Sequence, residues 1–193
     1  ADERTEAVER IGGANVLVND DGRLVAHNTD GIGCVGFLKR EGFAFEGARV
    51  AICGTGPTAL AILTACAEAD AAVAQAVLDG WLARGSQAGV ADPQGAALRI
   101  SASSYGKAAE RIAQADLVVN ATPVGMYPGN GVSPLDLRRV PQCRCVLDLV
   151  YNPARTALLQ QADRLGLRAE NGLSMLAEQA RCAAELFLQR PID

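Results

Sequence analysis

The 193-residue sequence has no long apolar segment, few aromatic residues and little excess charge. No run of apolar residues approaches the roughly 18 that a membrane-spanning helix needs. Eighteen basic and 22 acidic residues leave a net charge of −4, and the isoelectric point near 5.1 is unlike that of a basic nucleic-acid-binding protein. We therefore expect a soluble protein that has neither a membrane nor a nucleic acid as its partner.

Histidine and lysine are also scarce. His27 is the single histidine, so a His/Cys metal site is not expected. Lys39 and Lys107 are the two lysines, which limits the candidates for a catalytic ammonium group. The six cysteines are scattered, and two of them form a C-x-C pair that is too short for the usual zinc or redox spacing. We predict reduced, buried thiols in a cytoplasmic protein, and the charged start of the chain predicts no signal peptide.

The apolar residues are arranged as in a folded α/β protein. An apolar fraction of 49% excludes a disordered chain, and the length suits one or two domains. Strands are predicted at 48–53, 71–73, 98–101, 116–120, 144–150 and 167–169, and helices at 32–41, 60–69, 105–114, 155–165 and 172–188. This alternation predicts a doubly wound parallel sheet, the Rossmann-like architecture of dinucleotide-binding domains.

Some regions depart from this alternation. The charged segment 1–10 is predicted to form a short helix, and the apolar runs after it flank an Asp-Gly turn at 21–22 that is typical of a β-hairpin. The second strand is barely visible, because the pattern becomes helical over 74–84. Segment 124–134 is rich in glycine and proline and is predicted to be a mobile loop.

The strongest local motif is a glycine turn between the strand at 48–53 and the helix at 60–69. The turn has the G-x-G-x-x-A spacing and reads Gly54-Thr55-Gly56-Pro57-Thr58-Ala59. Such a turn brings backbone N–H groups and a helix N-terminus to a pyrophosphate. Proline fits the first helical position, where an N–H group would have no partner within the helix. The context favours phosphate binding over the alternative, a plain structural turn.

Two further polar segments allow two interpretations each. Asn120 and Thr122 follow a buried strand whose carboxyl end would face a ligand in a doubly wound sheet, and a simple turn is the alternative. Asp30 precedes a predicted helix, which Asn28 or Thr29 can also cap. Asp30 is either a capping residue or an active-site acid, and composition alone favours the cap.

Six short motifs occur in a fixed order along the chain. They are G-G-A-N-V-L-V around Asn15, H-N-T-D-G-I-G around Asp30, the turn G-T-G-P-T-A, the strand exit D-L-V-V-N-A-T-P-V-G-M, then D-L-V-Y-N-P and N-G-L-S-M-L-A-E-Q-A. Their order and spacing resemble those of the shikimate dehydrogenase family over essentially the whole chain. The resemblance implies an NADPH-dependent oxidoreductase of aromatic amino acid biosynthesis that reduces 3-dehydroshikimate to shikimate in a cleft between a substrate domain and a dinucleotide domain.

The resemblance also assigns roles to individual residues. The residues that match substrate contacts are Asn15, Asp30, Tyr151 and Gln179. Their amide, carboxylate and phenol groups suit a small polyhydroxylated ring. Asp30 matches the aspartate that holds and tunes a catalytic lysine. The residues that match cofactor contacts are Gly54, Thr55, Gly56, Pro57, Thr58, Asn120, Thr122, Leu149, Gly172 and Met175, the last as a wall of the nicotinamide pocket.

The chain departs from the family pattern in its N-terminal part. The serine pair and the N-V-T-x-P-x-K segment of the family are not found, and neither lysine lies in such a motif. By itself the chain is therefore expected to be incomplete for catalysis. We divide it into the end of a substrate domain with a linker (1–30), a dinucleotide-binding domain (31–171) and a C-terminal helix that packs toward the substrate domain (172–193). The apolar face of that helix is then exposed, or covered by another chain as in a homodimer.

A second departure concerns the adenosine half of the cofactor. The family's second strand ends in an arginine that binds the 2′-phosphate of NADP, and no arginine directly follows Val73. Asp79 has the spacing of an acid that binds the ribose of NAD, but it falls in the predicted helix. The resemblance favours NADP, with NAD as the alternative. Two alternative functions remain open, an NAD-dependent quinate/shikimate dehydrogenase and a dinucleotide-binding module without catalysis.

Overall fold

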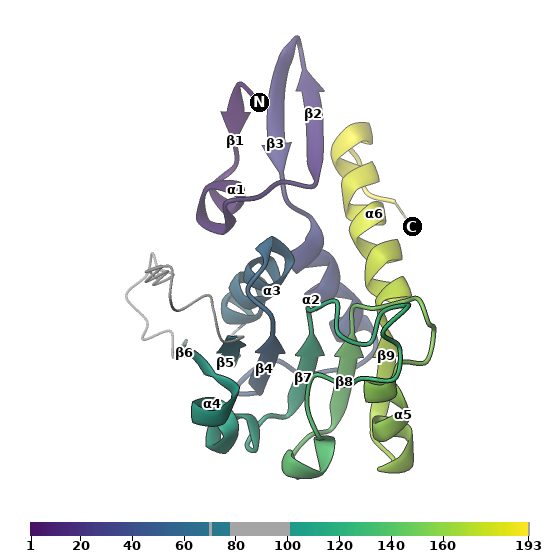
Figure 1. Cartoon of the computed structure of the whole chain (residues 1–193). Helices are drawn as coiled ribbons and strands as arrows, with labels where there is room; N and C mark the ends of the chain where they lie inside the picture. Colours follow the sequence, from purple (N-terminus) through teal and green to yellow (C-terminus); the bar gives the residue numbers. More distant parts are fainter. Residues whose placement is uncertain (70, 78–100, 193) are drawn as a thin grey trace.

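The computed structural model describes residues 1–69, 71–77 and 101–192. They form a larger parallel sheet flanked by helices and a smaller sheet near the N-terminus (Figure 1). In spatial order the larger sheet consists of β6 (Ser101–Ser104), β5 (Ala72–Val77), β4 (Arg49–Cys53), β7 (Leu117–Asn120), β8 (Cys145–Asp148) and β9 (Arg168–Asn171). The helices around it are α2 (Asp30–Arg40), α3 (Pro57–Glu68), α4 (Tyr105–Ile112), α5 (Ala157–Arg164), α6 (Gly172–Leu188) and the short 3-10 helix η2 (Leu137–Arg139).

The chain winds in opposite directions from the centre of this sheet. From β4 it runs outward to β5 and β6, and it then returns to the other side of β4 and continues through β7, β8 and β9. All these neighbours pair in parallel, so their carboxyl ends lie along one edge. The order confirms the predicted doubly wound α/β sheet. In such sheets ligands bind where the strand order reverses, which here is between β4 and β7.

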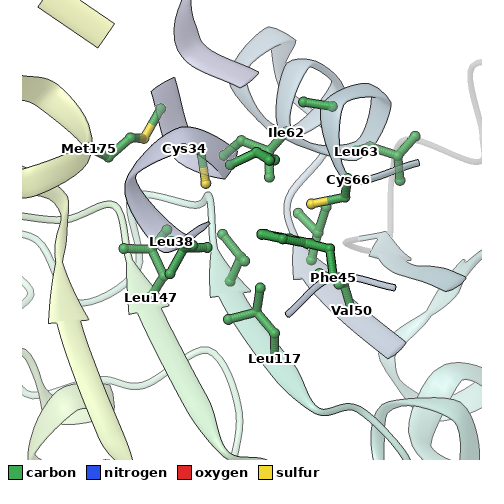
Figure 2. Close-up of a cluster of buried hydrophobic side chains, with 14 of the residues drawn as sticks. Cys34, Leu38, Phe45, Val50, Ile62, Leu63, Cys66, Leu117, Leu147 and Met175 are labelled. Atoms are coloured by element: carbon green, nitrogen blue, oxygen red, sulfur yellow. The ribbon is translucent and has the colours of Figure 1, made fainter. Parts of the chain in front are cut away.

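Alternating side chains on the central strands build two apolar layers. Val50 and Ile52 on β4 pack with residues of α2, α3 and α6 in the layer shown in Figure 2. Ala51, between them, packs with Val118 of β7 and with α5 on the opposite face. Successive residues of a strand point to opposite faces. Because both faces of β4 are covered, the strand forms one continuous apolar run in the sequence.

The smaller sheet contains β1 (Glu3–Arg4), β3 (Arg23–His27) and β2 (Val16–Asp20), in that spatial order. β2 and β3 pair antiparallel, and Asp21 and Gly22 between them have positive φ angles of 47° and 88°, as a tight hairpin turn requires. The predicted hairpin is confirmed. The predicted helix over 1–10 is only partly right, because residues 3 and 4 extend the hairpin edge by pairing with β3, and helix α1 spans Glu6–Ile11.

The structure contradicts the prediction for the segment after Val73. β5 continues to Val77 and pairs with β4 in parallel. Alanine favours helices, but hydrogen bonding to the neighbouring strand outweighs that preference. The predicted helix is therefore wrong for residues 74–77, and its remainder, which includes Asp79, lies outside the described residues.

Several elements begin one to three residues away from the predicted positions. The strand predicted at 98–101 overlaps β6 (Ser101–Ser104) at Ser101, and residues 98–100 lie outside the described part. α3 begins at Pro57 rather than at residue 60. The glycine turn therefore leads directly into the helix with proline in its first turn, where proline costs no hydrogen bond.

The six cysteines are buried thiols that form no disulfide, as the sequence predicts. Burial raises the pKa of the Cys66 thiol to about 12, so this thiol stays protonated and unreactive at neutral pH. Of the helices in the part of the chain that the structure describes, none has the length and apolar character of a membrane span.

α6 is the long helix that connects the two sheets. It begins at the carboxyl edge of the larger sheet, packs along α2 and reaches β2 (Figure 1). Its Glu178 is 4% exposed, and the carboxylate oxygens lie 2.8 Å from Arg181 Nη2 and 2.5 Å from Nη1 of Arg40 on α2. Hydrogen bonds from Arg181 and Arg40 hold the pKa of Glu178 below its usual value. The charged carboxylate therefore stabilises the contact between α2 and α6.

We expect Glu178→Gln to lower the free energy of unfolding at neutral pH by about 1–3 kcal/mol, because buried hydrogen bonds between charged groups are lost. A carboxyl group with a lowered pKa stabilises the fold above its unfolded pKa, and this contribution is lost as the pH falls through the folded pKa. The difference between wild type and variant should therefore shrink below about pH 4. Urea unfolding at several pH values measures it. Glu46→Gln, at an exposed site, is the control, and equal losses in both variants would contradict the prediction.

Candidate active site

A cavity of about 650 Å³ lies at the carboxyl edge of the larger sheet. Its lining residues are Asn15, Asp30, Thr58, Ala121, Thr122, Pro123, Met126, Tyr127, Leu149, Val150, Tyr151, Asn152, Gly172, Met175, Leu176 and Gln179. All four residues predicted as substrate contacts are among them. Of the predicted cofactor contacts, five line the cavity, namely Thr58, Thr122, Leu149, Gly172 and Met175, and five do not, namely Gly54, Thr55, Gly56, Pro57 and Asn120.

A second hollow, of about 780 Å³, lies beside η2 and α5. Its Asp136 and Arg138 pair with each other, and none of the predicted site residues lines it. It lies next to η2, which precedes β8, so it is not at the carboxyl ends of the strands where ligands bind. The smaller cavity is therefore the candidate site.

Asp30 is the first residue of α2, and its carboxylate is held from two sides. Oδ1 accepts a hydrogen bond from Asn15 Nδ2 at 2.9 Å, and Oδ2 accepts one from the Thr58 hydroxyl at 3.1 Å. The helix N-terminus is served by another side chain, because Asn28 Oδ1 accepts a hydrogen bond from the Asp30 N–H at 3.1 Å. Thr29 occupies the N-cap position without a side-chain cap. The interpretation of Asp30 as a cap is therefore wrong, and its carboxylate faces the cavity.

Gln179 reaches the same point from α6. Its Oε1 accepts hydrogen bonds from Asn15 Nδ2 at 3.1 Å and from the Thr29 hydroxyl at 3.2 Å. This contact requires α6 to approach α2 closely, since a Cβ atom on Gly33 would lie 2.8 Å from Gln179 Cα. A residue without a Cβ atom is needed at such a crossing. Gly33 therefore places Gln179 at the cavity, although Gly33 itself is not part of the lining.

The glycine turn after β4 is open and shaped for a phosphate. Gly54 has a φ of 122°, and a Cβ atom there would lie 2.7 Å from the Ala121 carbonyl oxygen. A Cβ atom on Gly56 would meet nothing within 4 Å, and no side chain caps the helix there. The N–H groups of Thr58 and Ala59 lie in the first helical turn, which offers them no acceptor within the helix. The turn adjoins the cavity through Thr58.

The opposite wall is formed where β8 ends and α6 begins. Leu149 and Tyr151 follow β8, and the Tyr151 side chain is 56% exposed. Met175 is buried on α6 and also lines the cavity. A Cβ atom on Gly172 would lie 2.0 Å from the Leu149 carbonyl oxygen, so α6 can begin this close to β8 only with glycine at its first position.

Asn120 ends β7 and is fully buried. Its Oδ1 accepts a hydrogen bond from the Thr122 hydroxyl at 2.6 Å, and its Nδ2 donates to Asp148 Oδ1 at 2.9 Å. Thr156, before α5, donates its hydroxyl to Asp148 Oδ2 at 2.6 Å. Asn120 does not itself line the cavity, but it holds Thr122, which does.

The sequence analysis did not identify Asp148 or Thr156. Asp148 belongs to the D-L-V-Y-N-P motif, but no local pattern marks a single acid at the end of an apolar strand as the acceptor of several hydrogen bonds. Burial raises the pKa of the Asp148 carboxyl, and the hydrogen bonds from Thr156, Val150 and Asn120 oppose this shift. The pairing of β7 with β8 brings Asn120 to Asp148.

The chain is similar in sequence to known enzymes. The chain is 36% identical over 190 residues to the NADP(+)-dependent shikimate dehydrogenase of Geobacillus kaustophilus, a match that covers 95% of the chain and 66% of that protein. It is 35% identical over 199 residues to the corresponding enzyme of Alkaliphilus oremlandii, covering 100% of the chain and 69% of that protein. The chain belongs to the shikimate dehydrogenase family. It spans about two thirds of the length of these relatives. No family model matches it.

Solved structures of several enzymes share this fold. The Listeria monocytogenes enzyme, in complex with shikimate and NAD, has a TM-score of 0.87 at 30% identity, covering 99% of this chain and 68% of that one. The Thermus thermophilus enzyme, in complex with NADP(H) and shikimate, has a TM-score of 0.81 at 31% identity, with coverages of 100% and 68%. A 5-ketofructose reductase of a Gluconobacter species has a TM-score of 0.81 at 28% identity, with coverages of 100% and 69%. The predicted family is confirmed.

In this member of the shikimate dehydrogenase family, Gly33→Ala should force α6 away from α2 and displace Gln179 from Asn15. We expect a loss of about 1–3 kcal/mol in the free energy of unfolding, because the added Cβ atom overpacks the helix crossing. Gly36→Ala on the same helix is the matched control. Its Cβ atom would meet only Glu178 Oε1, at 3.5 Å, and alanine should stabilise the helix by about 0.5–1 kcal/mol. Thermal unfolding of both variants measures the effect, and similar results for the two would contradict the proposed role of Gly33.

Proposed function

We propose that this chain supplies the dinucleotide site and part of the substrate site of a cytoplasmic, NADP-dependent shikimate dehydrogenase that reduces 3-dehydroshikimate to shikimate. One observation carries the proposal: a single cavity joins Asp30, Asn15 and Gln179 to the end of the phosphate turn and to the exits of β7 and β8. The activity of the relatives, whose names include NADP(+), supports it.

We further propose that residues 1–30 belong to the substrate domain, residues 31–171 form the dinucleotide-binding domain, and residues 172–193 pack back toward the substrate domain. The smaller sheet ends at His27 and α2 begins at Asp30, which supports the first boundary. α6 exposes Leu173, Leu176 and Phe187. This apolar surface is covered by another part of the enzyme or by a second copy in a homodimer.

The residues present fit a nicotinamide dinucleotide. The open turn at Gly54 to Thr58, with free space at Gly56, would hold the pyrophosphate on backbone N–H groups. Thr122, Leu149, Gly172 and Met175 would surround the nicotinamide end, since they line the adjoining cavity. When bound, the reduced dinucleotide supplies the hydride for the ketone carbon.

The polar side chains of the cavity fit a small polyhydroxylated ring. Asn15, Gln179 and Tyr151 offer amide and phenol groups as hydrogen-bond partners for hydroxyl groups. Asp30 is the one charged side chain among the described lining residues. The alcohol product needs a proton on the former ketone oxygen, and a carboxylate that holds an ammonium group beside this oxygen would direct that proton.

The described part of the chain places no lysine at Asp30. Lys39 lies at the exposed end of α2, and none of the described lining residues is a lysine. We propose that a lysine from outside this sequence pairs with Asp30 in the active enzyme. The 193-residue polypeptide on its own should then reduce 3-dehydroshikimate negligibly, because general acid–base assistance is typically worth ~10²–10⁴-fold in rate.

In an active enzyme that contains this sequence, Asp30→Asn should lower kcat by about 10²–10⁴-fold. The amide can still accept a hydrogen bond from Asn15, so the melting temperature should change little. What disappears is the negative charge that would hold a lysine. Steady-state kinetics and thermal unfolding are measured together, with Asp20→Asn at the exposed end of β2 as the control. If kcat stays within a few-fold while the melting temperature falls, Asp30 has a structural role and the proposed function loses its acid.

One observation favours NAD as a second candidate cofactor. Val77 is the last described residue of β5, and Asp79 comes two positions later in the sequence. An acid shortly after this strand is the feature that binds the ribose of NAD. The relatives named for NADP(+) favour NADP, whereas the Listeria enzyme was crystallised with NAD.

Titrations with NADP and NAD distinguish these candidates. We expect the lower Kd for NADP, measured by calorimetry on the active enzyme. A lower Kd for NAD, which Asp79→Ala abolishes, would instead indicate the NAD-dependent quinate/shikimate type. Binding of either dinucleotide without turnover of shikimate or quinate would indicate a module without catalysis.

A further inference from the structure

Asp148 is a buried carboxylate outside the cavity that touches both strand exits forming its wall. It is 0% exposed at the end of β8. Its Oδ1 accepts hydrogen bonds from Asn120 Nδ2 at 2.9 Å and from the Val150 N–H at 3.1 Å, and its Oδ2 accepts one from the Thr156 hydroxyl at 2.6 Å. All these partners are neutral donors. A buried carboxylate balanced only by neutral donors costs free energy that an apolar residue would not.

The Thr156 hydroxyl has a hydrogen-bond donor on one side and an acceptor on the other. Its oxygen accepts a hydrogen bond from the Leu159 N–H at 3.3 Å, as the cap of α5. Its proton is therefore donated to Asp148. Asp148 in this way ties the start of α5 to the end of β8.

The Asn120 amide is oriented in the same manner on the other side. Its Oδ1 accepts from the Thr122 N–H at 3.1 Å and from the Thr122 hydroxyl at 2.6 Å, and its Nδ2 donates to the Val124 carbonyl at 3.1 Å and to Asp148. The Thr122 oxygen accepts in turn from the Val124 N–H at 3.2 Å. These hydrogen bonds connect Val124, Thr122, Asn120 and Asp148 in one continuous chain. The exit of β7 is therefore a single hydrogen-bonded unit.

This unit reaches the cavity at two places. Thr122 lines it at the exit of β7, and Val150 lines it at the exit of β8. The Val150 N–H donates a hydrogen bond directly to the Asp148 carboxylate, and Thr122 is linked to the same carboxylate through Asn120. We propose that Asp148 is a positioning residue that holds the two strand exits in register, and that the dinucleotide-binding wall of the cavity keeps its shape through it. The identity of the ligand in this inference rests on the proposed function. The role of Asp148 in holding the two strand exits does not depend on it.

The substitutions separate this role from general stability. Asp148→Ala removes the acceptor for both exits. Asp148→Asn keeps an acceptor for Asn120 and Val150 if its amide oxygen takes the place of Oδ1, and it alters only the bond to Thr156. Asp116→Ala is the matched control, because Asp116 also accepts a backbone hydrogen bond, from the Arg49 N–H at 2.9 Å, but lies before β7 at the opposite edge of the sheet.

The test uses amide-resolved NMR on the full chain. For Asp148→Ala we expect faster hydrogen exchange of the Val124 N–H, which Asp148 does not touch, and a Kd for NADP that is about tenfold higher, as for the loss of one hydrogen bond. Asp148→Asn should restore most of both effects. Asp116→Ala should destabilise the protein and leave the Kd and the Val124 exchange rate relative to global unfolding unchanged.

The outcomes distinguish the two proposals. If Asp148→Ala resembles Asp116→Ala in both measurements, Asp148 only stabilises the fold and the inference is overturned. Unchanged exchange at Val124 overturns it as well, whether or not NADP binds. If the wild-type chain and the active enzyme bind neither NADP nor NAD, the proposed function fails. Faster exchange at Val124 in Asp148→Ala would then still establish that Asp148 holds the two strand exits together.

Discussion

The close packing of α2 against α6 is the constraint on which the site depends. A glycine at position 33 lets the two backbones approach, and the buried carboxylate of Glu178 is bound by arginines from both helices. Asp30 begins one of these helices and Gln179 lies on the other. Without this crossing, Asn15 could not bind both side chains at once, as it does at 2.9 and 3.1 Å. Charge pairing and glycine packing thus bring together residues that are far apart in the sequence.

In the larger sheet, apolar residues occupy the middle of the central strands, and polar residues occupy the carboxyl ends of β7 and β8. The middle of each central strand carries aliphatic side chains buried on both faces. The carboxyl ends carry Asn120 and Asp148, which are equally buried but hydrogen-bonded to each other. The apolar layers stabilise the fold through burial, whereas the directional polar network orients the loops. The loops that line the cavity therefore begin at the hydrogen-bonded carboxyl ends of β7 and β8.

Local patterns predicted much of this protein correctly. The run R-V-A-I-C and the glycines after it predicted β4, the turn and α3, because a strand buried on both faces and a tight turn each leave a strong local signal. β5 was predicted as helix beyond Val73, because its alanines carry no such signal and its strand conformation comes from pairing with β4. The family motif assigned Asp30 to the site, whereas its residue type alone suggested a helix cap. In the structure Asn28, not Asp30, accepts the hydrogen bond at the start of α2.

The sequence by itself determined most of the alternation of strands and helices and the glycine turn after β4, because each depends on neighbours within a few positions along the chain, and the family resemblance indicated the polar residues of the site. The tertiary structure alone decided which of them meet. Thr58 reaches Asp30 at 3.1 Å across 28 positions, and Gln179 reaches Asn15 across 164. It also decided that Asn120 supports the wall rather than lining it, because its partner Asp148 comes from the adjacent strand. Contacts of this kind depend on strand order and helix crossing, which no local pattern encodes.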